Sequence, residues 1–471
     1  MDAMVIVGLV IAIVAIVGLA IYTGAKKGSG KKEGISSAVV AGLIMGTLVG
    51  GSSTVGTAQL AYNYGMSAWW FTLGAGLACL ILALVYVKPL RASGCPTLVG
   101  MIKQEYGPSA GMAATVLNSI GTFINILSQL LAASAVIQVI WVTMGTPVAI
   151  IASAVFMVLY VVFGGAKGAG IVGLLKLVLL YVAMVSCGVI ALNKLGGVGG
   201  AFAAMDDFSA SLGRNFRSLF CRGLGTDAGA CVSLILGVLT TQTYAQAVLS
   251  AKTDRNARVG ALVSTFLIPP IGIFGILVGL YMRTVTDPAT FAAKTALTSF
   301  ILNYSNMPGL LSGIVLGALF IASVGTGAGL ALGIATMINR EFIQNKGKGK
   351  KFSADTMSKI LIVVVLALAT ALSCTPIGDT ILKFAFMSMG LRGCTVFAPL
   401  CFLIWAKGKI SGKYALGSIL GGSIVALILG VLNLFEVIKL PCDAVFPGVA
   451  VGLIVMFVGL AGSKNQKTLK A

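Results

Sequence analysis

Polar side chains that could bind a small solute gather in GGSSTVGTAQLAYNYG, residues 50–65, inside an apolar run. The glycines in this stretch favour a break in a helix, and a break leaves backbone N–H and C=O groups without partners. At membrane depth such groups are tolerated only beside buried protein or a water-filled cavity, and broken helices of this kind mark solute sites. We therefore predict solute contacts from Ser52, Ser53, Thr54 and Gln59. The alternative is that these side chains bond to their own backbone.

Two further polar clusters are candidates for the same site. One lies in GVLTTQTYAQ, residues 237–246, again within an apolar run. The other lies mostly along one face of a helix because its members are three or four residues apart, namely Asn118, Thr122, Asn125 and Ser128 or Gln129. Hydrogen bonding between helices explains these side chains as well as solute contact does. The predicted solute ligands from the two clusters are Thr241, Gln242, Tyr244, Gln246, Asn125 and Gln129.

Several kinds of chemistry lack the residues that they require. The sequence has no histidine, and its nine cysteines form no C-x-x-C pair, which argues against histidine catalysis, haem and the common metal sites. The carboxylates lie in expected loops or near expected helix ends, so no buried acidic pair is available for acid/base work. An enzyme is therefore disfavoured, and no cofactor is expected. Cys221 and Cys231 share one polar loop, where a disulfide can form if that loop is external.

The composition is that of a membrane protein. Hydrophobic residues make up 58% of the 471 residues, charged residues 10%, and the mean hydropathy is +1.02. Soluble domains carry about 25% charged residues. The net charge of +20 comes from short Lys and Arg clusters between apolar runs, a pattern typical of cytoplasmic loops and not of nucleic-acid binding. We interpret KGKGKK, residues 346–351, in the same way, with lipid or nucleic-acid binding as its alternative.

Windows of about 20 residues predict an all-α polytopic protein with about thirteen transmembrane helices. The basic clusters favour an external N-terminus and a cytoplasmic C-terminus. The expected spans are residues 4–22, 36–64 with an interruption, 66–87, 109–141, 147–163, 169–192, 229–250, 260–282, 308–338, 357–374, 379–405, 414–434 and 445–462. The longer connections, 193–228 and 284–307, are expected to be external loops.

Four segments in the right order resemble the sodium:solute symporter family. They are GTAQLAYNYGMSAWW at 56–70, KPLRASGCPTLVGMIKQEYG at 88–107, YVVFGGAKG at 160–168 and IASVGTGAGLALGIATMINREF at 321–342. The likeness covers most of the chain. It implies the leucine-transporter fold, in which two inverted repeats of five helices each begin with a broken helix and the two breaks face one another at the midplane.

The resemblance also divides the chain. Residues 1–35 are expected to form an extra N-terminal helix with a basic loop, 36–192 the first inverted repeat, and 193–228 an external loop. Residues 229–405 then form the second inverted repeat, and 406–471 two C-terminal helices with a tail.

The sequence departs from the family at the implied sodium site. Sodium-coupled members use backbone carbonyls of the first core helix, which correspond to Gly46 and Val49 here, and two hydroxyls of the eighth, which fall on Gly325 and Thr326. One hydroxyl is therefore missing. The family's T-D-x-x-Q on the fifth core helix becomes VGLLK, so the acidic residue is lost and Lys176 appears. Because hard cations require oxygen ligands, the sequence predicts a weakened sodium site.

Lys176 lies in the apolar run LLKLVLLYV, where a charge costs roughly 2.5–3.5 kcal/mol on insertion scales. It could reach the cytoplasmic interface along its flexible stem. The functional interpretation is that its ammonium replaces the sodium ion and donates to the Gly46 and Val49 carbonyls and to Thr326. Transport would then be coupled to protons or to no ion, with sodium symport as the alternative.

These observations predict a secondary active transporter in the cell membrane that moves a small organic solute by alternating access. Lys383 and Arg392 add positive charge to the tenth core helix, and no acidic residue is expected at mid-membrane, which favours an anionic or zwitterionic solute over a cationic one. A channel and a transporter-like sensor are the alternatives from other classes. The solute's identity and the oligomeric state stay open.

Overall fold

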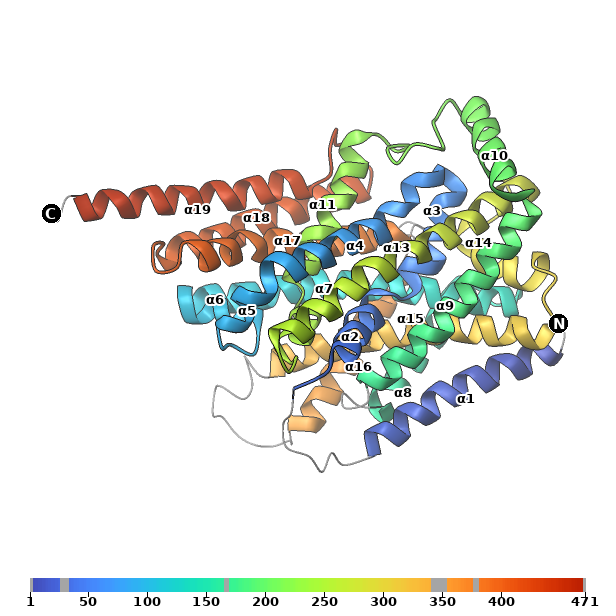
Figure 1. Ribbon diagram of the computed structural model, residues 1–471, viewed down its shortest axis with the longest axis horizontal. Coiled ribbons are helices and arrows are strands. Elements are labelled where there is room, and N and C mark those ends of the chain that lie inside the picture. Colours follow the sequence, from blue (N-terminus) through green and yellow to red (C-terminus); the bar gives the residue numbers. More distant parts are fainter. Residues whose placement is uncertain (1–2, 26–33, 165–168, 340–353, 376–380, 469–471) are drawn as a thin grey trace.

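The computed structural model describes residues 3–25, 34–164, 169–339, 354–375 and 381–468, and these fold into a bundle of helices (Figure 1). Within these residues the one β-bridge joins Ile35 to Ala251. The basic run at 346–351 and Asp379 lie outside the described residues. The first helix begins and the last helix ends at opposite ends of the long axis (Figure 1).

The N-terminal half begins with one long helix and continues with a broken one. Between the two parts of the broken helix, Ser52–Gly56 forms a π-helical turn, and Gly65–Trp69 forms a 3-10 turn after the second part. The helices are α1 (Ala3–Ala25), α2 (Ser37–Leu48), α3 (Thr57–Tyr64), α4 (Trp70–Ile81), α5 (Val87–Ala92), α6 (Leu98–Tyr106), α7 (Pro108–Ile140), α8 (Thr146–Gly164) and α9 (Ala169–Lys194).

The C-terminal half contains the second broken helix, α11 and α12, bent by 48° at Thr241. Its helices are α10 (Gly197–Leu212), α11 (Leu224–Thr240), α12 (Gln242–Leu249), α13 (Asp254–Val285), α14 (Ala296–Ser299), α15 (Gly309–Ile338), α16 (Ala354–Ser373), α17 (Ile381–Trp405), α18 (Gly412–Leu434) and α19 (Val445–Thr468). The segments 193–228 and 284–307, expected to be external loops, contain the helices α10 and α14, and their external position stays a prediction.

Nine helices of the described residues are long and apolar enough to cross a membrane, or ten if the bent pair α11 and α12 is one span. This agrees with a polytopic membrane protein, whereas the count of thirteen and the orientation stay predictions. The apolar windows of α7 and α15 are 89% and 83% buried, but that of α16 is only 22% buried. The core of the bundle therefore lies around α7 and α15.

Small residues allow the helices to approach closely. On α2, a Cβ added to Gly46 would lie 3.1 Å from the Cα of Gly173 in α9. On α1, a Cβ added to Gly8 would lie 2.2 Å from the Leu310 carbonyl of α15. Close approach of this kind is how membrane helices gain packing energy without a hydrophobic driving force. The α2–α9 crossing matters most here, because it brings Lys176 to the first broken helix.

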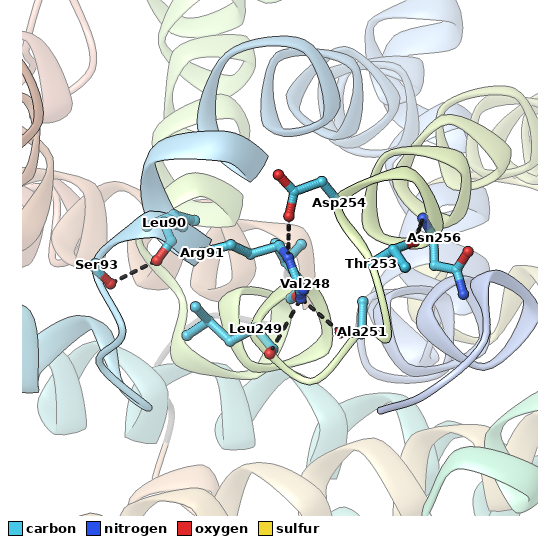
Figure 2. A network of polar contacts seen from close by, with 9 residues as sticks. All are labelled: Leu90, Arg91, Ser93, Val248, Leu249, Ala251, Thr253, Asp254 and Asn256. Carbon is cyan, nitrogen blue, oxygen red and sulfur yellow. Dashed lines mark hydrogen bonds and ion pairs between the residues drawn. The ribbon is translucent and has the colours of Figure 1, made fainter. Parts of the chain in front are cut away.

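Arg91 of α5 joins its own helix to α12 and α13 (Figure 2), in a region that the basic residues predict to be cytoplasmic. Its Nε donates to Asp254 at 2.6 Å, and its Nη1 donates to the Val248, Leu249 and Ala251 carbonyls at 3.0, 3.4 and 2.7 Å. A cation at the C-terminal end of α12 satisfies carbonyls that have no helical partner. Since Ile35 before α2 also bonds to the 250–252 segment, this end ties α2, α5, α12 and α13 together.

Candidate functional site

The first break lies at Val49–Gly51. Val49 leaves the helical region with φ −92° and ψ 102°. A Cβ on Gly51 would lie 2.3 Å from the Ala132 Cβ of α7, and one on Gly50 would lie 2.7 Å from the Thr326 hydroxyl of α15. Glycine is therefore required at both positions, because side chains of α7 and α15 occupy the space that a Cβ would need.

The hydroxyl groups after the break satisfy its backbone. Ser53 Oγ accepts from the Gly50 N–H at 3.0 Å and donates to the Gly50 carbonyl at 2.9 Å. Thr54 Oγ1 donates to the same carbonyl at 3.0 Å. Both side chains are buried. In this structure Ser53 and Thr54 therefore make the backbone bonds that were the alternative to solute contact.

Side chains of α7 complete the first break. Gln129 accepts from the Gly51 N–H at 3.0 Å and donates to Ser52 Oγ at 2.8 Å. Ser52 also bonds to Ser128 at 2.9 Å, and Ser128 bonds to the Asn125 side chain at 2.9 Å. The structure thus brings Ser52, Asn125 and Gln129 into one buried polar chain that links α7 to the break.

Lys176 reaches the first break from α9, and its side chain is buried. Its Nζ donates to the Gly46 carbonyl at 2.8 Å and to Thr326 Oγ1 at 2.7 Å. The Val49 carbonyl is not among its acceptors, so that part of the prediction was wrong. The break turns the Val49 peptide out of the helical direction, which leaves Gly46 as the acceptor on α2. Lys176 therefore does not turn to the interface but links α2, α9 and α15.

Gly325 stands where the family pattern places a hydroxyl. A Cβ added there would lie 3.5 Å from Cζ and from the hydroxyl of Tyr160 in α8, which is ordinary contact. The packing would therefore accept a small side chain at Gly325. The packing around position 325 therefore does not explain why a glycine replaces the hydroxyl residue of the family pattern.

The second break carries a cation that the sequence did not connect to it. Arg392 of α17 is fully buried, and its Nη1 donates to Thr241 Oγ1 at 2.8 Å. Its Nε donates to the Ser388 carbonyl at 3.2 Å, and its Nη2 donates to Ser388 Oγ at 3.0 Å and Met389 Sδ at 3.1 Å. Ser388 in turn donates to the Gly121 carbonyl of α7 at 2.6 Å. All of these acceptors are neutral.

The other predicted ligands are divided among several places. Tyr244 is buried close to Arg392, whereas Gln246 is exposed. Gln242 turns to the start of α6, where it accepts from the Leu98 N–H at 2.9 Å. Gln59 accepts from the N–H of Ile381 at the start of α17, also at 2.9 Å. Successive side chains point in different directions around α3 and α12, so these two polar stretches do not line one surface.

Three remaining sequence expectations concern charge and cysteine. Lys383 donates to the Leu434 carbonyl at 3.4 Å, and Asp379, its expected partner, is outside the described residues. Cys221 and Cys231 are both free thiols, so the disulfide considered from the sequence is not formed. Burial raises the pKa of the Cys221 thiol, and nearby Asp227 raises it further.

Possible metal ligands at the first break are oxygen atoms of the backbone and of hydroxyl side chains. No group of three or more His, Cys, Asp or Glu side chains that could hold one exists within the described residues. The family resemblance assigns sodium to oxygens of Gly46, Val49 and Thr326. Two of these, the Gly46 carbonyl and Thr326 Oγ1, already accept from Lys176.

Known proteins share the sequence and the fold. The human high affinity choline transporter 1 is 24% identical over 416 residues, 81% of this chain and 69% of that protein. The uncharacterized symporter YwcA of Bacillus subtilis is 29% identical over 155 residues, 32% of this chain and 30% of that protein. A solved Na+-coupled sialic acid symporter in its outward-open state has a TM-score of 0.76 at 15% identity, covering 98% of both chains.

A second solved structure, the nucleobase-cation-symport-1 family transporter Mhp1, has a TM-score of 0.60 at 12% identity and covers 92% of this chain and 94% of that one. These structures establish the leucine-transporter type of fold. The profile of the sodium:solute symporter family matches residues 32–422, which include both broken helices. The chain is therefore a multi-pass membrane transporter that belongs to the sodium:solute symporter family.

Proposed function

We propose that this transporter moves a small organic solute without sodium, and that the Lys176 ammonium replaces the coupling ion. The observation that carries the proposal is the pair of bonds from Lys176 Nζ to the Gly46 carbonyl and Thr326 Oγ1 at 2.8 and 2.7 Å. Sodium would use the same two oxygens, and the ammonium brings the same charge. Coupling to protons, or to no ion, follows.

The sequence changes around this position support the same conclusion. The acidic residue of the family pattern is absent from the fifth core helix, and Gly325 lacks a hydroxyl although its surroundings would accept one. A sodium ion at this position would lack ligands that hard cations require. Sodium symport remains the alternative, favoured by the Na+-coupled sialic acid symporter that shares the fold.

The charge at the two breaks favours an anionic or zwitterionic solute. The choline transporters among the relatives are named for a quaternary ammonium cation. Here Lys176 and Arg392 place two positive charges near the breaks, and every acceptor that the structure gives them is neutral. A cationic solute would meet repulsion in a site of low dielectric. Two unlike broken helices also suit alternating access better than a channel pore.

Uptake into proteoliposomes tests the proposal. Wild-type protein is expected to show saturable, counterflow-competent uptake of an anionic or zwitterionic solute with equal rates in sodium and in potassium. Saturation and counterflow distinguish a transporter from a channel. Uptake that requires a sodium gradient, and that Lys176→Gln leaves unchanged, would overturn the proposal.

A further inference from the structure

Arg392 occupies the same place in the second predicted repeat as Lys176 does in the first. Lys176 lies on α9, the fifth helix of its repeat, and bonds to Gly46 near the end of α2, the first half of its own broken helix. Arg392 lies on α17, also a fifth helix, and bonds to Thr241 at the end of α11. Both cations therefore sit at the C-terminal end of a half-helix, where the dipole is negative.

Each cation also connects to the third helix of the other predicted repeat. Lys176 bonds to Thr326 on α15, the third helix of the other repeat. Arg392 bonds to Ser388, which donates to the Gly121 carbonyl on α7, also the third helix of the other repeat. A Cβ on Gly121 would lie 2.7 Å from Cγ of Arg392, so the glycine makes room for the arginine.

The guanidinium of Arg392 has unused hydrogen-bonding capacity. It has five N–H donors, and within the described residues only four bonds use them. One of these goes to the Met389 thioether, which is a weak acceptor. One N–H of Nη1 has no acceptor in the described part of the chain. A buried guanidinium in this condition carries a large desolvation cost that a carboxylate would offset.

Asn118 is a second buried group with unused capacity. It lies one turn before Gly121 on α7, so it shares the face that contacts Arg392. Its side chain is 1% exposed, and its Oδ1 has no hydrogen-bond partner among the residues that the structure describes. Because an amide can turn to present either its oxygen or its NH2 group, Asn118 can donate to a bound anion.

We propose that Arg392 binds a carboxylate of the transported solute, so that the solute class is organic acids or amino acids. The two carboxylate oxygens accept from Nη1 and Nη2 in the end-on, bidentate geometry that guanidinium favours, and one of them replaces Met389 Sδ. Thr241 and Ser388 keep the guanidinium oriented. Arg392 is fully buried here, so solute reaches it only after the helices around the second break separate, as alternating access requires.

This inference rests on the proposed transport of a small solute, and it is tested by ligand binding. Purified full-length protein is heated in sodium-free buffer with the potassium salts of lactate, succinate or glutamate, or with choline chloride or glucose. At least one carboxylate is expected to raise the Tm of the wild type, because a ligand of the native state stabilises it by mass action. Choline and glucose are expected to have no effect.

The variants assign the effect to Arg392. Arg392→Lys keeps the charge but loses the planar, bidentate donor geometry of the guanidinium. We expect it to weaken the apparent affinity for the carboxylate at least tenfold. We expect Arg392→Gln to abolish binding and Asn118→Leu to weaken it several-fold. Lys383→Gln, which removes a positive charge from the same helix, is the control and is expected to retain binding. Asn118→Leu and Arg392→Lys keep the test decisive if Arg392→Gln does not fold.

Three results would overturn the inference. They are the absence of stabilisation of the wild type by any carboxylate in both sodium-free and sodium-containing buffer, protection by choline or glucose alone, and an unchanged carboxylate affinity in Arg392→Lys or Arg392→Gln. If carboxylate binding depends on Arg392 but also requires sodium, then the sodium-independent proposal fails while this inference stands.

Discussion

Replacement of Lys176 by alanine tests whether its ammonium stands in for a cation. The variant loses two charge-assisted bonds, to the Gly46 carbonyl and to Thr326 Oγ1. Hydrogen bonds to charged groups contribute about 1.5–3 kcal/mol each, or about 3–6 kcal/mol together. Removal of a charge from membrane depth offsets roughly 2.5–3.5 kcal/mol of this loss. We therefore expect a net loss of stability of roughly 0–3 kcal/mol, in the absence of sodium.

Sodium should distinguish the variant from the wild type. With Lys176 in place the two oxygens are occupied, so the wild type should melt at the same temperature in potassium chloride and in sodium chloride of equal ionic strength. In Lys176→Ala the oxygens and the vacated space become available to a cation. Sodium at ten times its Kd would then restore about 1.4 kcal/mol. The measurement is thermal unfolding of purified protein in the two salts.

Lys383→Ala is the matched control, because it removes a lysine of α17 whose only described bond is a long one to the Leu434 carbonyl. It should lower the Tm little and equally in both salts. Stabilisation of the wild type by sodium over potassium would refute the reasoning, since it would show that a sodium site exists beside Lys176. Failure of sodium to stabilise Lys176→Ala over potassium would contradict the expectation that the vacated oxygens bind the ion.

Three other predictions follow from the described contacts. Arg91→Ala should lower the free energy of unfolding by about 1.5–3 kcal/mol, because it leaves carbonyls at the end of α12 without their donor. Asp254→Asn should lower it by less than about 1 kcal/mol, since that carboxylate is half exposed. Equal effects of the two variants in thermal unfolding would contradict this prediction. Gly51→Ala should lower the free energy of unfolding by about 1–3 kcal/mol or prevent folding, because its Cβ would collide with α7. Gly199→Ala, whose Cβ would have no atom within 4 Å, is the control and should leave expression and Tm unchanged. Burial raises the pKa of Asp443, although a backbone N–H and a neighbouring arginine lower it. The contribution of Asp443 to stability is therefore greatest below the ordinary pKa of 3.8 and is lost as pH rises through the raised pKa. Tm measured against pH should show this fall in the wild type and not in Asp443→Asn.

Much of the fold could be predicted from the sequence. Apolar runs of the right length predicted most of the long helices, and Gly50 with Gly51 predicted the first break, because only glycine permits such close approach of neighbouring helices. The resemblance indicated where Lys176 would go, and two of its three expected acceptors are present. The short helices α10 and α14 were missed, since they lie in segments that length and polarity describe only as loops.

Only the tertiary structure decided which polar residues meet. Arg392 bonds to Thr241 across 151 positions of sequence, and no local periodicity encodes such a contact. Gln242 and Gln246, close to Thr241 in sequence, point elsewhere because each residue of a helix turns the next side chain to another face. The sequence by itself thus determined most of the long apolar helices and where the first broken one is interrupted. How α9 and α17 pack determined that each break receives a cation, because a buried charge is held by oxygens that only packed neighbours can supply.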